Sequence, residues 1–157
     1  MRKLLVIFGL ALFAGNLFAQ TPDNVKEKFK KNYPDVSAVY WKNLKDNSYK
    51  VNYTDKTERH AIVYDKDGNV LREELEVKEA SIPAGVKDYY KTRTAGDKDY
   101  AAAYTVWEVT GKDGTKTYYS EYKGKYAYFD KEGKQTTKQG MVEGEEPMKD
   151  DKMPVDK

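Results

Sequence analysis

Cysteine is absent from the 157-residue chain, and histidine occurs only once, at His60. Without cysteine the chain cannot form disulfides, cannot be anchored as a lipoprotein through an N-terminal cysteine, and has no thiol nucleophile. A zinc site would need carboxylates as the partners of the lone histidine. The stability of the fold must therefore come from packing and hydrogen bonding rather than from covalent cross-links.

Catalytic signatures are missing as well. The chain contains no Gly-x-Ser-x-Gly, no His-Glu-x-x-His and no phosphate-binding glycine loop. The adjacent acids Glu73 and Glu74 would point to opposite faces of a strand, so they cannot form the carboxylate pair of a glycosidase. We predict that the protein is not an enzyme and uses no cofactor.

Residues 1–19 have the pattern of a secretory signal peptide. Arg2 and Lys3 precede an apolar run from Leu4 to Phe18, and cleavage is expected after Ala19. This run is shorter than the ~20 residues that a membrane-spanning helix needs. We predict a periplasmic or secreted protein that has no membrane span in its mature chain.

The charge balance depends on this segment. Removing Arg2 and Lys3 leaves 26 basic and 26 acidic residues, so the mature chain is formally neutral. It also lacks a block of basic residues that would attract a phosphate backbone. We therefore expect no nucleic-acid partner.

A turn sequence occurs twice, 65 residues apart. Tyr64-Asp65-Lys66-Asp67-Gly68 returns as Phe129-Asp130-Lys131-Glu132-Gly133, each time after an alternating apolar run. An Asp-x-acid-Gly sequence between two such runs predicts a hairpin turn. Its repetition indicates a duplicated module, which we place at residues 20–79 and 80–139.

Each half combines one helix with several strands. Val25, Phe29 and Tyr33 recur at helical spacing before Pro34, and Pro83 begins a second helix that contains Val86. Alternating apolar runs after each helix predict antiparallel strands. We expect an α+β fold of tandem αβ4 repeats, forming one sheet of about eight strands with two helices on one face. Residues 140–157 lose the periodicity and are predicted to be a mobile polar tail.

At this point the chain resembles the exported PepSY-like proteins related to the β-lactamase-inhibitor fold, which are typical of Bacteroidetes. The matching residues of the first half are Val25, Phe29, Tyr33, Pro34, Val39, Trp41, Tyr49, Val51, Tyr53 and 64–68; those of the second half are Ile82, Pro83, Val86, Tyr104, Val106, 118–122 and 129–133. The resemblance implies the tandem fold, no enzymatic activity, and a sheet face that grips a protein. Because fold does not determine function, inhibition of a β-lactamase is only an analogy.

The first turn also has some features of a calcium loop. Asp65 and Asp67 could supply carboxylate ligands, but an EF-hand needs its glycine at position six, whereas Gly68 is at position four. We favour the hairpin turn and keep calcium-dependent sensing of the cell envelope as a minor hypothesis.

Aromatic residues are abundant, with 14 tyrosines and 2 tryptophans. Two short helices cannot cover all the rings on the strands, so we expect one set on the open sheet face, where such rings suit recognition. The candidate binding residues are Trp41, Tyr100, Tyr104, Trp107, Tyr119, Tyr126 and Tyr128.

Three functions remain open at this point. The first is a non-enzymatic module that grips an unknown protein or peptide of the cell envelope on the open face, an inhibitor being one form of it. The second is binding of a small molecule or glycan on the same aromatic face. The third is calcium-dependent sensing. The sequence does not indicate which strand face is exposed.

Overall fold

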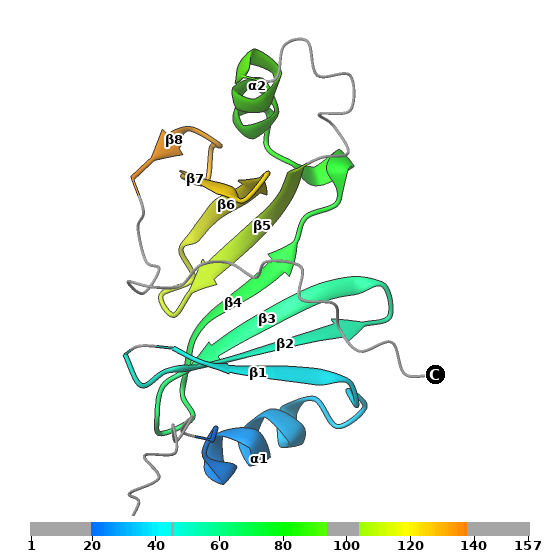
Figure 1. Ribbon diagram of the computed structural model, residues 1–157, viewed down its shortest axis with the longest axis vertical. Helices are drawn as coiled ribbons and strands as arrows, with labels where there is room; N and C mark the ends of the chain where they lie inside the picture. Colours follow the sequence, from blue (N-terminus) through cyan, green and yellow to red (C-terminus); the bar gives the residue numbers. More distant parts are fainter. Residues whose placement is uncertain (1–19, 45, 94–103, 138–157) are drawn as a thin grey trace, which may run out of the picture.

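The chain folds into one eight-stranded antiparallel sheet with two helices (Figure 1). The computed structural model describes residues 20–44, 46–93 and 104–137; the predicted signal peptide and polar tail lie outside them, as does Tyr100. The elements are α1 (Asp23–Asn32), β1 (Val39–Asn43), β2 (Tyr49–Asp55), β3 (Glu58–Tyr64), β4 (Val70–Glu76), η1 (Glu79–Ser81), α2 (Ala84–Arg93), β5 (Tyr104–Gly111), β6 (Lys116–Tyr122), β7 (Lys125–Phe129) and β8 (Gln135–Thr136). Within the described ranges, no helix is long and apolar enough to cross a membrane.

The strands follow one another along the sheet in chain order, and every neighbouring pair is antiparallel. Strands β4 and β5 join the two halves, with Glu74 opposite Val109 and Glu76 opposite Trp107. The order of one helix and four strands therefore occurs twice in one continuous sheet. The prediction of an α+β fold built from tandem αβ4 repeats is confirmed.

Helix α1 packs on the first four strands through its apolar stripe. Val25 and Phe29, four residues apart and so on one face of the helix, are buried. They pack against side chains of β2 and β3: Tyr49, Val51, Tyr53, Ile62 and Tyr64. Phe29 meets the rings of Tyr33 and Tyr53 at centroid distances of 5.0 and 5.3 Å. Aromatic packing thus supplies much of the burial here.

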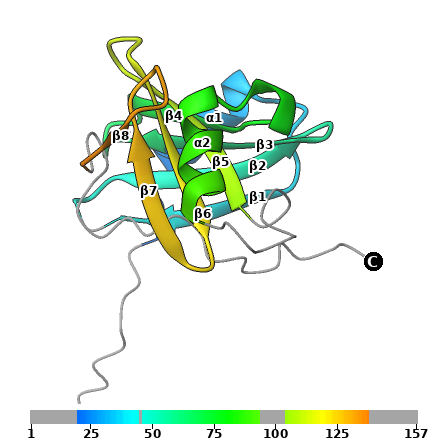
Figure 2. The ribbon, with the colours of Figure 1, turned by 90° about the horizontal axis from the view of Figure 1, so that it is seen from above.

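Helix α2 repeats this arrangement at the other end of the sheet (Figure 1), where it lies beside β7 (Figure 2). Val86 and Tyr90, again four residues apart, pack with Val106, Ala127 and Phe129. The Tyr90 hydroxyl and the Ser120 Oγ share a buried hydrogen bond of 2.7 Å. Burial raises the pKa of Tyr90 to about 12, so the hydroxyl stays neutral.

The repeated turn has the same geometry in both halves. The Asp65 side chain accepts hydrogen bonds from the backbone N–H groups of Asp67 and Asn69, at 2.9 and 2.8 Å. The carboxylate of Asp130, in the second copy, accepts the two equivalent bonds, at 3.1 and 2.8 Å. Gly68 and Gly133 have φ values of +76° and +81°, which favour glycine. The turn residues are therefore fixed by backbone needs.

Strand pairing assigns every side chain to one of two sheet faces, because directly opposed residues point to the same side. Val51, Ile62, Val106 and Phe129 point toward the helices. The residues that alternate with these along each strand, such as Lys50, point to the other side of the sheet, which we call the opposite face. No helix among the described elements packs on it.

We expect Tyr90→Phe, but not Tyr64→Phe, to destabilise the protein. The Tyr64 hydroxyl is buried without a hydrogen-bond partner, so removing it should be neutral or stabilising. Tyr90→Phe leaves Ser120 without its partner and should cost about 1 kcal/mol. Urea denaturation of both variants would measure this difference, and equal losses would contradict it.

Candidate functional site

Four of the predicted aromatic residues do gather on the opposite face. Trp107 and Tyr119, which oppose each other on β5 and β6, stack with ring centroids 6.1 Å apart and planes 12° apart. Tyr126 and Tyr128 of β7 pack against the same cluster, which also contains Val109. The four rings thus form an aromatic ladder across three neighbouring strands.

Two predicted residues lie on the other side of the sheet. Trp41 packs beneath α1, with its ring centroid 5.7 Å from that of Phe29. Tyr104 stacks on Tyr90 of α2 at 4.1 Å. Their place on the open face was therefore predicted wrongly. The reason is that alternation divides a strand into two faces but does not say which face a helix will cover.

The aromatic rings at the centre of the opposite face are also less exposed to solvent than the sequence analysis predicts. Trp107 and Tyr119 are only 7% and 2% exposed, so the prediction of an open platform is wrong for these two rings. Tyr126 and Tyr128 are half-buried. The sequence analysis missed Tyr40 of β1, which is 46% exposed and opposes Asn52 on this face.

A buried charge cluster adjoins the aromatic ladder. Glu74 of β4 accepts hydrogen bonds from Lys50 Nζ at 2.8 Å and from Arg72 Nε at 3.0 Å. The Tyr119 hydroxyl donates to the same carboxylate at 2.9 Å. Lys50, Arg72 and Glu74 are at most 4% exposed. Two cations and one anion give this cluster, which we call the Glu74 cluster, a formal charge of +1.

The electrostatics keep Glu74 ionised. Burial alone raises the pKa of its carboxyl, but the charges of Lys50 and Arg72 outweigh burial and hold the pKa below its ordinary value. This cluster was not predicted from the sequence, because a lysine that alternates with apolar residues along a strand resembles a solvent-facing side chain. The sequence does carry a signal for it: Lys50, Arg72 and Glu74 are oppositely charged residues that fall on the same face of the sheet. That signal can be used only when the order of the strands is known.

Arg59 of β3 connects the charged and aromatic parts of the face. Its Cζ lies 5.3 Å from the ring centroid of Trp107. Its Nη1 lies 3.1 Å from Glu76 Oε2. A guanidinium over an indole is a favourable cation–π geometry, so Arg59 contributes to covering Trp107.

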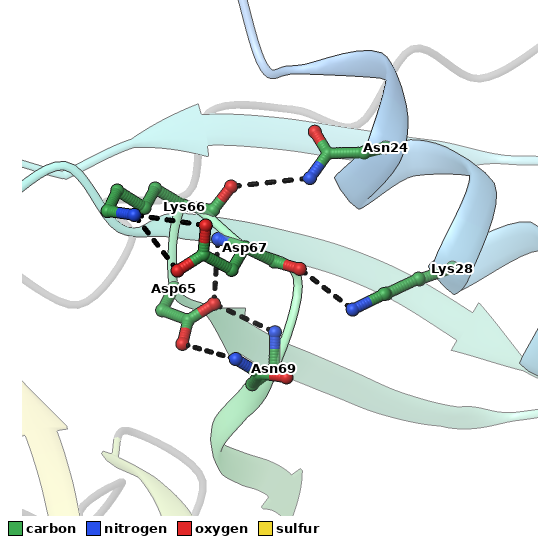
Figure 3. Close-up of polar contacts among 6 residues, drawn as sticks. All are labelled: Asn24, Lys28, Asp65, Lys66, Asp67 and Asn69. Carbon is green, nitrogen blue, oxygen red and sulfur yellow. Dashed lines mark hydrogen bonds and ion pairs between the residues drawn. The ribbon is translucent and has the colours of Figure 1, made fainter.

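The turn at Asp65 is occupied by hydrogen bonds rather than arranged for calcium (Figure 3). Asn69 Nδ2 donates to Asp65 Oδ2 at 2.8 Å, and Lys66 pairs with Asp67 at 2.9 Å. Lys28 Nζ of α1 donates to the Asp67 carbonyl at 2.7 Å. The hydrogen bonds that the Asp65 carboxylate accepts, first from the backbone N–H and the side chain of Asn69 and then from the Asp67 N–H, lower the pKa of Asp65. The ammonium groups of Lys28 and Lys66, both held against Asp67, oppose the binding of a cation at this turn.

The part of the chain that the structure describes contains no other candidate metal site. There, no group of three or more histidine, cysteine, aspartate or glutamate side chains is placed to hold an ion. The Asp65 turn acts as a structural tie between α1 and the β3–β4 hairpin, because Asn24 and Lys28 both donate to its backbone carbonyls.

Comparison with known proteins shows similarity in fold. A proposed periplasmic protein from Bacteroides eggerthii aligns with a TM-score of 0.57 at 16% identity, covering 73% of this chain and 85% of its own. A DUF2874 family protein from Bacteroides uniformis aligns with a TM-score of 0.54 at 15% identity, covering 73% and 85%. A BLIP-like protein from Bacteroides fragilis reaches 0.44 at 19% identity, covering 73% and 82%. No family model and no curated protein matches the chain.

These identities establish a shared fold and nothing about activity. The descriptions of the three proteins name no enzymatic reaction. The chain is thus similar in fold to a Bacteroides protein described as periplasmic and to a Bacteroides protein of the DUF2874 family.

Proposed function

We propose that this is an exported, non-enzymatic binding protein that holds a protein or peptide of the cell envelope on its opposite face. In this proposal residues 1–19 direct export and are removed after Ala19, and the chain is a PepSY-like relative of the β-lactamase-inhibitor fold. An inhibitor is one form of such a protein. In that case the partner would be an enzyme, and binding would lower its activity.

The observation that carries the proposal is the composition of the opposite face. Exposed Tyr40 lies at one end of it and half-buried Tyr126 and Tyr128 at the other, with the Glu74 cluster between them. Exposed tyrosines are typical of protein recognition surfaces, whereas the Glu74 cluster is itself buried and supports the strands beneath them. Tyrosine gives large contact area at a small loss of conformational entropy.

The dimensions of the face favour a protein over a small ligand. From β1 to β7 the sheet extends roughly 29 Å at ~4.8 Å per strand. A standard protein interface covers about 800 Å² on each partner, which is a patch of similar width. The hollow beside the aromatic ladder, between Val109, Tyr119 and Tyr128, has a volume of about 10 Å³. Such a hollow is too small for a sugar ring, so we place the glycan alternative second.

Affinity capture from the native envelope fraction tests the proposal. The mature protein should retain a specific partner, and Tyr40→Ser combined with Tyr128→Ser should weaken that retention at least about tenfold, because a recognition tyrosine contributes 1 kcal/mol or more. The matched control is Val39→Ser. Val39 neighbours Tyr40 and is 37% exposed, but it opposes Tyr53 on the helix face.

Melting temperatures separate binding from folding. The proposal requires the double variant to lose the partner while melting close to wild type. Equal retention by the double variant and wild type would refute the proposal, and so would an equal loss with Val39→Ser.

A further inference from the structure

A second candidate site lies on the helix side of the sheet. A cavity of about 450 Å³ opens between the C-terminal end of α2 and the β6–β7 hairpin. Among the described residues, its lining includes Tyr89, Tyr90, Arg93, Tyr122, Lys123 and Lys125. Cavities of 300–1,000 Å³ are typical of small-molecule sites. This one is therefore large enough for a ligand, unlike the hollow beside the aromatic ladder.

Three cations surround this cavity. Arg93 Cζ lies 4.0 Å from the ring centroid of Tyr89, and Lys123 Nζ lies 5.0 Å from that of Tyr122. Lys125 is exposed at the first position of β7. The described lining contains no carboxylate, and no described carboxylate forms an ion pair with Arg93 or Lys125. Arg93 and Lys125 thus bring positive charge to the described lining, although the mature chain is neutral overall.

The walls are aromatic and well supported. Tyr90 contacts Tyr89 edge-on at 5.1 Å and lies 5.8 Å from Tyr122. Its hydroxyl is fixed by the buried hydrogen bond with Ser120. The rings are therefore held in place before any ligand arrives, which reduces the entropy that binding would cost.

We propose that this cavity binds a small organic anion, namely a carboxylate or sulfate carried on an aromatic or sugar ring. Arginine forms bidentate bonds with carboxylate and sulfate oxygens, and the lysines add point charges. Tyrosine rings stack equally well on an aromatic ring or on the apolar face of a sugar, so both sources of the anion fit the same chemistry. Of the aromatic ladder, only Tyr126 also lines this cavity. The cations and the other rings of the cavity lie outside the ladder, so this proposal does not depend on the proposed function.

Isothermal titration of the mature protein with four probes tests the proposal. The acids are 4-hydroxyphenylacetate and D-glucuronate; their neutral counterparts are 4-hydroxyphenylethanol and D-glucose. At least one acid should bind with 1:1 stoichiometry, at least about tenfold tighter than its neutral counterpart, because charge-assisted bonds are the strong ones. The tighter of the two acids identifies the ring as aromatic or saccharide. Binding should weaken as salt increases.

Variants locate the site. Arg93→Gln combined with Lys125→Gln should weaken binding of the acid at least about tenfold. Lys91→Gln and Lys112→Gln, which remove exposed lysines outside the cavity lining, should leave it unchanged. Absence of binding by both acids would overturn the proposal. Equal binding of acid and neutral probes would also overturn it, as would binding that Arg93→Gln and Lys125→Gln leave intact.

Discussion

Replacing Glu74 with glutamine is expected to destabilise the protein by about 3–5 kcal/mol, because the change removes the buried negative charge that Lys50 and Arg72 share. Glu74 is fully buried and accepts bonds from Lys50, Arg72 and Tyr119. Glutamine keeps the shape of the side chain and removes only its charge. The loss would therefore measure an electrostatic effect rather than a cavity.

Glu73→Gln is the matched control for this change. Glu73 is the neighbour of Glu74 on β4, opposes Ile62 on the helix face and is exposed. Its replacement should change stability by no more than about 0.5 kcal/mol. Urea denaturation of the three proteins measures both values. A loss in Glu74→Gln no larger than in Glu73→Gln would contradict the account of the Glu74 cluster.

The pH dependence of stability gives the same cluster a second signature. The pKa of Glu74 is lower in the folded protein than its ordinary value. Its ionised form therefore stabilises the fold above the unfolded-state pKa of about 4.3, and this contribution is lost as pH falls through the folded-state pKa. The difference between wild type and Glu74→Gln should accordingly shrink in acid.

Gly133→Ala is expected to cost about 2–5 kcal/mol, the sum of a left-handed backbone and an overpacked contact. Gly133 has a φ of +81°, and a Cβ placed there would lie 2.9 Å from Pro83 Cβ and 3.2 Å from the Val86 backbone nitrogen. Pro83 immediately precedes α2 and Val86 lies in its first turn, so the start of the helix packs directly on the turn at Gly133. The substitution should therefore push α2 away from the second half of the sheet.

Gly124→Ala separates the two contributions. Gly124 has a similar φ of +76°, but a Cβ there would meet no atom within 4 Å. It should lose only the backbone part, about 1–2 kcal/mol. Thermal melting of both variants tests the difference. Equal destabilisation would show that α2 does not pack closely on the turn.

The duplicated architecture could be predicted from the sequence because local signals carry it. Asp65 and Asp130 each need an Asp-x-x-Gly turn for the same backbone bonds, and the apolar spacing of Val25 with Phe29 permits only a helix face. These requirements act within a few residues. Such local requirements can therefore be recognised from the pattern of residue types alone.

The sides of the sheet could not be predicted because tertiary packing chooses them. Trp41 and Trp107 both lie on strands whose side chains alternate between the two faces. Trp41 nevertheless packs under α1, whereas Trp107 lies on the opposite face. Lys50 resembles a solvent-facing lysine until β4 brings Glu74 beside it, 24 residues away. Such pairings depend on strand order and register, which the local alternation does not contain.

Hydroxyl-radical footprinting of the mature protein, alone and with its captured partner, tests the central claim most directly. Oxidation reports the accessibility of each aromatic side chain. If the partner binds on the opposite face, oxidation of Tyr40 and Tyr128 should fall on binding, while Tyr33 and Tyr89 on the helix side remain unchanged. Protection confined to Tyr33 and Tyr89, with Tyr40 and Tyr128 unaffected, would contradict binding on the opposite face.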